Sequence, residues 1–187
     1  MKNNFIVIEG LDGVGKTTVS NLLAKRLGGV AYKTPPNIFQ KIRKVISLKN
    51  PKFRFYFFLL SLFLASIEIS ILKRKQHVIC DRYLYSTIAY HKAASVNVFS
   101  RFSFWKRFIL RPDKCFYLWA RPEILEKRIN FRKYNSIGDI IVRDDRELRV
   151  KIHKNFLELK YLFGLEIIDV SEMNLEDVVN FILKQQG

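Results

Sequence analysis

The stretch FIVIEGLDGVGKTT, residues 5–18, decides the fold of this 187-residue chain. Its first four residues, Phe5 to Ile8, form the apolar and β-branched run that a central parallel strand, buried on both faces, requires. Residues 10–17 match the pattern G-x-x-x-x-G-K-[ST] at every fixed position, and a helical segment at 16–27 follows directly. A strand, a glycine-rich loop and a helix thus come in the order of a phosphate-binding loop.

The residues of this loop suit nucleoside-triphosphate chemistry. Its three glycines let successive backbone N–H groups curl around phosphate oxygens, and the helix N-terminus adds partial positive charge. Lys16 can reach the β- and γ-phosphates, and the Thr17 hydroxyl can bind a bridging magnesium ion. The expected nucleotide-binding residues are Gly10, Leu11, Asp12, Gly13, Val14, Gly15, Lys16, Thr17 and Thr18.

The net charge of the chain is its unusual bulk property. There are 33 Lys and Arg residues against 17 Asp and Glu, which gives +16 at pH 7. Such a surface attracts anions, so nucleic acid, anionic lipid and free nucleotides are all candidate partners. A solvated basic surface that serves only solubility is the alternative.

Cysteine and histidine usage favours a cytoplasmic protein without a zinc site. Cys80 and Cys115 lack C-x-x-C spacing and lie in apolar strand-like runs, so we expect two buried free thiols in a reducing cytosol. The three histidines form no ligand cluster. The first strand begins almost at the N-terminus, and we expect no signal peptide.

One segment, Phe53 to Leu72, is apolar on nearly every face of a helix. Arg54 and Glu68 interrupt the roughly 20 apolar residues that a bilayer crossing needs, so no membrane span is expected. We expect a fully buried helix or one at a subunit interface. Because one domain cannot cover all its faces, a two-fold homodimer through this helix is predicted, unless the aromatic segment 99–110 covers it.

Strands and helices are expected to alternate along the chain, which favours an α/β fold with a doubly wound, parallel five-stranded sheet. The expected strands are 5–8, 30–33, 77–80, 114–119 and 165–170. The expected helices are 16–27, 38–48, 51–72, 84–94, 99–110, 122–132, 144–163 and 174–184. We expect one domain, residues 1–187, with a mobile lid at about 132–145.

Asp81-Arg82-Tyr83 follows the third strand, at the sheet edge where α/β proteins bind ligands. Asp81 can hold the magnesium shell or orient the attacking oxygen, and Arg82 offers a planar fork to an acceptor phosphate. Alternatively, Asp81 caps the next helix and Arg82 only pairs with it.

These motifs resemble those of the thymidylate kinases. Residues 5–18 resemble the family's phosphate loop, and DRYLYSTIAY at 81–90 resembles its DRY segment. Arg111-Pro112-Asp113, Phe116-Tyr117-Leu118, Arg121-Pro122-Glu123 and Ile168-Asp169-Val170-Ser171 are similar to later segments, so the resemblance spans nearly the whole chain. It implies the nucleoside monophosphate kinase fold and a homodimer.

The resemblance also implies roles for individual residues. Asp12 matches an acidic position that approaches the sugar of the acceptor, and Arg82 matches the arginine that grips its phosphate. Gly13 stands where some members have a catalytic arginine, which other members supply from the lid. Candidates for that lid arginine are Arg128, Arg132 and Arg143; a solvated helix face is their alternative role.

The chain departs from the family pattern around the acceptor base. Members carry Ala-Asp-Arg on the long third helix, and here that place falls near Leu60, with Arg54 and Glu68 the only charges nearby. His91 stands where members have Gln, and Lys33-Thr34-Pro35-Pro36 replaces an Arg-Glu-Pro or Pro-Glu-Arg segment. The expected acceptor-binding residues are Asp12, Arg82, Tyr90 and Arg54.

The leading hypothesis is a magnesium-dependent enzyme that moves the γ-phosphoryl group of ATP to a nucleoside monophosphate, with dTMP as the favoured acceptor. Its expected catalytic residues are Lys16, Asp81, Arg82, Arg132 and Arg143. A related kinase with another nucleotide or a nucleoside as acceptor is the second hypothesis. The third is a nucleotide-dependent nucleic-acid-binding protein, which the charge suggests but no RNA- or DNA-binding motif supports, so nucleic acid is not an expected partner.

Overall fold

A computed structural model gives the fold of the chain and describes residues 3–36, 38–39, 42, 46, 50–98, 105, 107–130 and 145–185. Five strands form one sheet in the order β2-β3-β1-β4-β5, and every neighbouring pair is parallel. The strands are β1 (Phe5–Gly10), β2 (Val30–Lys33), β3 (Val78–Asp81), β4 (Lys114–Trp119) and β5 (Glu166–Asp169). The predicted doubly wound parallel sheet is therefore confirmed.

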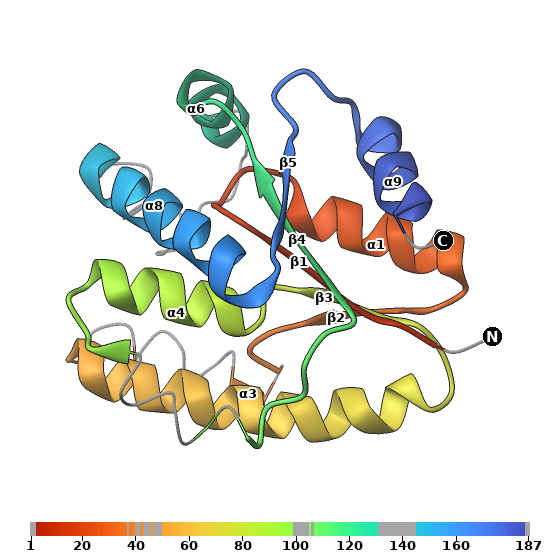
Figure 1. Cartoon of the computed structure of the whole chain (residues 1–187), viewed down its shortest axis with the longest axis horizontal. Coiled ribbons are helices and arrows are strands. Elements are labelled where there is room, and N and C mark those ends of the chain that lie inside the picture. The colour runs from red at the N-terminus through yellow and green to blue at the C-terminus, as the bar shows by residue number, and fades with distance from the viewer. Residues whose placement is uncertain are drawn as a thin grey trace.

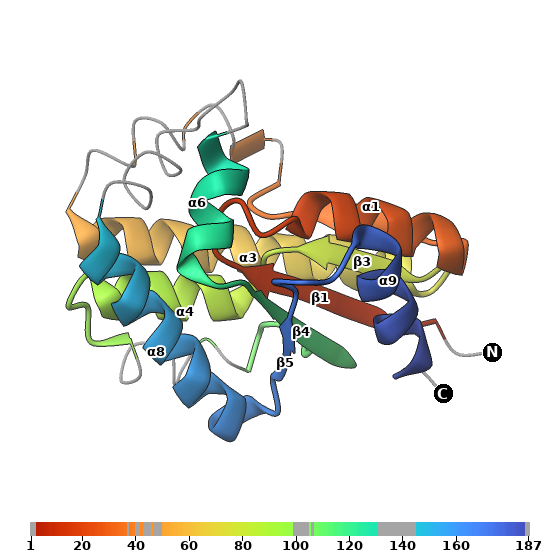
Figure 2. The same ribbon diagram turned by 90° about the horizontal axis from the view of Figure 1, so that it is seen from above.

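Helices cover both faces of this sheet. They are α1 (Lys16–Leu27), α3 (Pro51–Lys73), α4 (Leu84–Ala93), α6 (Pro122–Asn130), α8 (Arg146–Phe163) and α9 (Leu175–Lys184). In Figure 1, α1 and α9 lie on one face, and α3, α4 and α8 on the other. The carboxyl ends of the strands meet at one edge, where the loop after β1 and helix α6 lie close together (Figure 2).

Local sequence signals set the helix ends. Gly28 ends α1 in the left-handed conformation, with φ 63°, and its N–H bonds back into the last turn. Asn50 caps α3 by accepting a bond from the Lys52 N–H, with Pro51 in the first turn, and Asp145 caps α8 in the same way. These stop and start signals can all be read in the sequence.

The core is built on β1, in which Phe5, Ile6, Val7 and Ile8 are completely buried between β3 and β4. Cys80 and Cys115 are buried free thiols, as predicted. Each lies on a strand beside β1, where a small apolar side chain fits the close packing of the sheet.

Helix α3 differs from the fully buried alternative. One face packs into the core through Phe55, Leu59, Leu62, Ala65 and Ile69. The opposite face carries large apolar side chains that are 37–56% exposed: Phe53, Tyr56, Leu60, Leu64, Ile67 and Ile71. Within the described residues, α3 is the one helix long and apolar enough to cross a bilayer, but its buried face belongs to the core of the fold.

Two expected helices and the lid are only partly covered by the description. The prediction of a helix at 99–110 is wrong at its C-terminal end, because residues 107–109 form a turn or bend and Leu110 has no regular structure. Ile38, Phe39, Ile42 and Ile46 are helical, and the remaining residues of 38–48 lie outside the described ranges. The same holds for residues 131–144 and so for Arg132 and Arg143.

Candidate functional site

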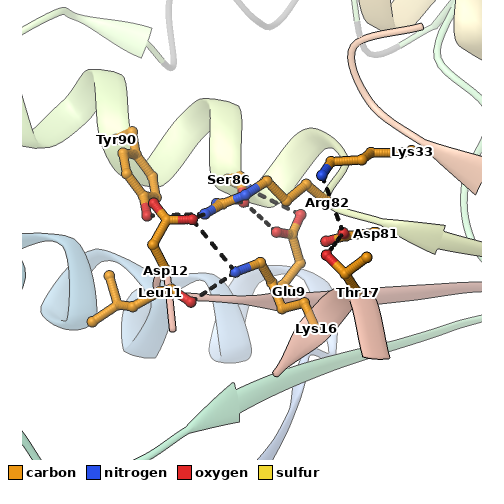
Figure 3. Close-up of polar contacts among 10 residues, drawn as sticks. All are labelled: Glu9, Leu11, Asp12, Lys16, Thr17, Lys33, Asp81, Arg82, Ser86 and Tyr90. Atoms are coloured by element: carbon orange, nitrogen blue, oxygen red, sulfur yellow. Dashed lines mark hydrogen bonds and ion pairs between the residues drawn. The ribbon is translucent and has the colours of Figure 1, made fainter. Parts of the chain in front are cut away.

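The phosphate loop brings Lys16 to the start of α1. Gly15 is the N-cap of this helix with φ 101°, and Gly13 has φ 89°, conformations that favour glycine. Lys16 is buried, and its Nζ donates to the Leu11 carbonyl at 2.7 Å and lies 3.8 Å from Asp12 Oδ1 (Figure 3). Burial, with the nearby Arg82 charge, lowers the pKa of Lys16 to about 8. The loop therefore holds a desolvated ammonium group beside the helix N-terminus.

A second contact joins this loop to β3. The Thr17 hydroxyl donates to Asp81 Oδ2 at 2.5 Å, and Lys33 Nζ lies 3.9 Å from the same oxygen. Asp81 is buried, and its other oxygen, Oδ1, has no hydrogen-bond partner in the part of the chain that the structure describes. A buried carboxylate oxygen without a donor is costly, so this atom suits a cation or its water shell.

Arg82 lies across the same edge and contacts Asp12. Its Nη2 donates to Asp12 Oδ1 at 2.5 Å, and its guanidinium carbon lies 5.2 Å from the centre of the Tyr90 ring. Burial by itself would lower the pKa of Arg82, but Asp12, Tyr90 and Glu9 together more than offset this effect and raise the pKa, so the group stays cationic. The predicted residues Asp12, Arg82 and Tyr90 thus form one cluster. The described contacts contain no ion pair between Asp81 and Arg82, so they do not support the alternative in which Arg82 only pairs with Asp81.

Two residues of this cluster were not among the predicted site residues. Glu9 is completely buried and accepts hydrogen bonds from the Tyr83 and Ser86 N–H groups, at 2.9 and 3.0 Å, and from the Ser86 hydroxyl. Ser86 in turn accepts a bond from Arg82 Nη1 at 3.0 Å. The available sequence signal was a carboxylate placed directly after an apolar strand and before the first loop glycine.

Beyond Tyr90, an aromatic wall lines the side of α4 that faces α3. The buried His91 ring lies 5.3 Å from the Phe55 ring and 5.6 Å from the Phe58 ring. Its Nδ1 donates to the Thr87 carbonyl at 2.7 Å, and burial lowers the pKa of His91 to about 4, helped by the Arg54 charge. Arg54 is therefore near His91.

On the other side of the phosphate loop lies a pocket of about 210 Å³. Arg128 lines it and donates from Nη2 to the Val170 carbonyl at 3.1 Å. The remaining lining residues are Gly13, Val14, Gly15, Thr18, Val19, Leu118, Val170, Met173, Asn174, Leu175 and Val178. The pocket thus opens beside the loop between α1, α6 and α9.

Comparisons with known proteins agree on one family. A sequence model of the family described as thymidylate kinase matches residues 8–182. The chain is 34% identical to a probable thymidylate kinase of Methanocaldococcus jannaschii, over 97% of this chain and 94% of that protein. It is 32% identical to a probable thymidylate kinase of Methanococcus aeolicus, over 98% and 95%.

Solved structures show the same fold. The thymidylate kinase of Candida albicans superposes with a TM-score of 0.79 at 21% identity, covering 98% of this chain and 91% of that one. That of Ehrlichia chaffeensis superposes with a TM-score of 0.77 at 22% identity, over the whole of both chains.

Proposed function

The chain belongs to the thymidylate kinase family, and from this premise we infer that it transfers the γ-phosphoryl group of ATP to dTMP, giving dTDP and ADP. One observation carries this conclusion. The phosphate loop and the Asp81-Arg82 segment, far apart in sequence, meet at the carboxyl edge of the sheet through the Thr17–Asp81 and Asp12–Arg82 contacts.

ATP occupies the phosphate-loop side of this edge. The N–H groups of the loop and the N-terminus of α1 hold its phosphates, and Lys16 leaves the Leu11 carbonyl to bind the β- and γ-phosphates. The adenosine lies in the pocket beside Arg128, which offers a planar cation against an aromatic base. We therefore assign Arg128 to ATP and keep Arg132 and Arg143 as the candidate lid arginines.

The acceptor binds on the opposite side. Arg82 presents its guanidinium to the phosphate of dTMP, and Asp12 accepts a hydrogen bond from a sugar hydroxyl. Tyr90 lies next to both. The base extends toward Phe55, Phe58 and His91, where Arg54 adds a positive charge to the rim.

The site fits a magnesium ion. Thr17 Oγ1 and the buried Asp81 carboxylate are hard oxygen ligands, and Asp81 Oδ1 lacks a partner among the described residues. Thr17 and Asp81 would hold the ion, which supplies neutralisation of charge on the transferring phosphates. The protein's own part is to position the two nucleotides and to exclude water.

The transfer needs no covalent enzyme intermediate. An oxygen of the dTMP phosphate attacks the γ-phosphorus of ATP in line, and the bond from that phosphorus to the β-γ bridging oxygen breaks as ADP leaves. Lys16 and Arg82 approach the transferring group from the donor and acceptor sides and offset its negative charge.

An ADP-release assay with each deoxynucleoside and ribonucleoside monophosphate tests this function. We expect ATP-dependent turnover with dTMP as the preferred acceptor, and loss of turnover when magnesium is chelated. A higher kcat/KM for another acceptor would support a related kinase instead. Absence of turnover with every monophosphate, in protein that binds ATP, would contradict the proposal.

We further propose that the cytoplasmic protein is a single-domain subunit of a homodimer formed through α3. Two pairs of the exposed apolar residues of α3 are symmetric about position 62: Leu60 with Leu64, and Phe53 with Ile71. The third pair, Tyr56 and Ile67, lies six and five positions from it. An antiparallel copy related by a two-fold axis at Leu62 would therefore place Leu60 against Leu64 of the second copy. Such a pairing would cover the exposed stripe on both chains.

Light scattering with charge substitutions tests this arrangement. We expect a mass near twice 22.1 kDa for the unaltered protein and weakened dimers for Leu60→Lys or Leu64→Glu alone. An equimolar mixture of the two variants should restore the dimer, because one Lys–Glu pair and one Leu–Leu pair then face each other. Leu157→Lys, on an exposed position of α8, is the matched control. A mass near 22.1 kDa for the unaltered protein rules the dimer out.

A further inference from the structure

Glu9 is a charged residue at the centre of the site that no nucleotide can reach. It ends the core run of β1, pairs in register with Tyr117 of β4, and has none of its surface exposed. Burial raises the pKa of Glu9, while its hydrogen bonds to Ser86 and the Arg82 charge act in the opposite direction. A buried carboxylate is tolerated only where donors surround it, so its contacts point to its role.

Those contacts all lie at the start of α4. Glu9 Oε1 accepts from the N–H groups of Tyr83 and Ser86, and Tyr83, the N-cap residue, makes no side-chain cap of its own. Glu9 therefore caps α4 from a different strand, and its charge faces the positive end of that helix. The helix start is thereby tied to the end of β1, next to the phosphate loop.

The Ser86 hydroxyl extends this contact to Arg82. A hydroxyl has one proton, and the Ser86 hydroxyl donates that proton to Glu9 Oε2. The lone pairs of Ser86 Oγ are then left for Arg82 Nη1, which donates to it at 3.0 Å. Glu9, by accepting the Ser86 proton, thus sets the direction of the bond that orients the guanidinium.

The backbone of Arg82 needs such support. Its φ of 68° lies in the left-handed region, which costs a non-glycine residue about 1–2 kcal/mol. The Arg82 N–H bonds to the Ile8 carbonyl, and its own carbonyl accepts from the Thr34 hydroxyl. Strand β1 consequently holds the Arg82 backbone directly through Ile8. It holds the Arg82 side chain indirectly, through the bond from Ser86 of α4 to Glu9.

We propose that Glu9 is a positioning residue for the phosphoryl acceptor: through Ser86, its carboxylate orients the Arg82 guanidinium for the acceptor phosphate without touching the nucleotide. This inference rests on the proposed function, because it takes Arg82 as the ligand of that phosphate. Asp12 and Ser86 then hold the two terminal nitrogens of Arg82 from different elements.

Two substitutions break this relay at different atoms. Glu9→Gln keeps the shape and one acceptor for the two backbone N–H groups, but its NH2 group donates to Ser86 and leaves the hydroxyl proton without its acceptor. Ser86→Ala removes the link and keeps Glu9 on the helix. Each variant should raise KM for dTMP about tenfold, with KM for ATP within about twofold. Because both substitutions interrupt the same Glu9–Ser86–Arg82 chain of hydrogen bonds, the double variant should have the same KM for dTMP as either single variant.

Ser66→Ala is the matched control for loss of a buried serine. Ser66 bonds to the Tyr83 hydroxyl and the Leu110 N–H and has no described contact with Arg82. It should lower thermal stability and leave KM for dTMP unchanged. The inference is overturned if Glu9→Gln leaves KM for dTMP unchanged or raises both KM values equally. It is also overturned if the effects of Glu9→Gln and Ser86→Ala on KM for dTMP multiply in the double variant. If Glu9→Gln does not fold, an unchanged KM for dTMP in folded Ser86→Ala overturns it.

A nucleotide-free measurement separates this inference from the proposed function. In protein labelled with 15N-arginine, the Arg82 guanidinium should give a signal with slow proton exchange that both variants lose and Ser66→Ala keeps. An unchanged signal in both variants overturns the positioning role, even if dTMP is phosphorylated. Lack of turnover by the unaltered protein contradicts the function alone, since the signal still reports how Arg82 is held.

Discussion

Arg82 Nη2 and Asp12 Oδ1 lie 2.5 Å apart, and this ion pair joins the acceptor side of the site to the phosphate loop. The same Asp12 oxygen lies 3.8 Å from Lys16 Nζ. One carboxylate is therefore shared by the cation that we assign to the acceptor phosphate and the cation that we assign to ATP. An incoming acceptor phosphate must compete with Asp12 for Arg82, and binding on one side changes the charge balance on the other.

Arg82→Ala should raise KM for dTMP far more than KM for ATP. The lost contact is a charge-assisted bond to a dianionic phosphate, worth about 2–4 kcal/mol, or roughly 30- to 700-fold in KM. Steady-state kinetics with each substrate varied in turn measures both constants. Arg82→Gly is the companion variant, because glycine accepts the left-handed backbone without strain. Equal effects on the two substrates would show that Arg82 is structural.

Lys16→Ala should reduce kcat by about 100-fold or more and leave the protein folded. Lys16 is a buried cation at the start of α1, so its removal takes away a desolvated charge and introduces the best helix former. Coupled-assay kinetics and urea unfolding check the two parts of this prediction. Lys25→Ala, an exposed lysine on the same helix, should leave turnover unchanged. Normal turnover with alanine at position 16 would refute the ATP-site assignment.

The buried His91 should make the protein less stable as the pH falls below 6.5. The unfolded chain binds a proton at its ordinary pKa of 6.5, whereas burial lowers the folded-state pKa to about 4, so between these values the unfolded state binds more protons. At pH 5 this difference amounts to about 2 kcal/mol of lost stability.

Urea unfolding at pH 7 and pH 5 measures this loss for the unaltered protein and for His91→Gln. The glutamine variant should lose about 2 kcal/mol less between the two pH values, whatever its stability at pH 7. The same pH dependence in both proteins would mean that His91 titrates normally in the folded state.

Gly13→Ala should destabilise the protein more than Gly28→Ala. Both glycines have positive φ, so both alanines are strained, but a Cβ at position 13 would lie 2.5 Å from Ile129 Cγ1 of α6. Among the described residues, apart from the two chain neighbours, no atom lies within 4 Å of the Cβ position at Gly28. We expect a loss of about 1 kcal/mol at position 28 and about 2–4 kcal/mol at position 13. Denaturant unfolding gives both values. Equal losses would show that α6 can shift to accommodate the new Cβ without a loss in the free energy of unfolding.

The same contact explains why an arginine at position 13 would not suit this chain. Some family members have one in this loop, but here Leu125 and Ile129 of α6 occupy the space beside Gly13. An arginine therefore requires α6 to move. This packing supports our proposal that the catalytic arginine comes from the lid rather than from the phosphate loop.

The sequence by itself determined the sheet and the phosphate loop, and it predicted that Asp81 and Arg82 lie at the ligand edge. These features depend on local patterns: an apolar β-branched run, glycines at fixed spacing, and caps such as Asn50 and Asp145. The acid and the arginine after β3 could also be assigned to the ligand edge, because parallel strands bring their carboxyl ends to one side. The expected helix at 99–110 was wrong at its end, since aromatic content alone does not mark where a helix stops.

Only the tertiary structure decided which face of α3 is buried and what Glu9 contacts. Helix α3 is apolar all round, so its periodicity cannot separate Phe55 and Leu59 in the core from Leu60 and Leu64 at the surface. Glu9 and Ser86 are 77 residues apart, and neither belongs to the fixed positions of the loop motif. Their contact depends on the depth to which α4 packs beside β1, which is set by the side chains of the whole core.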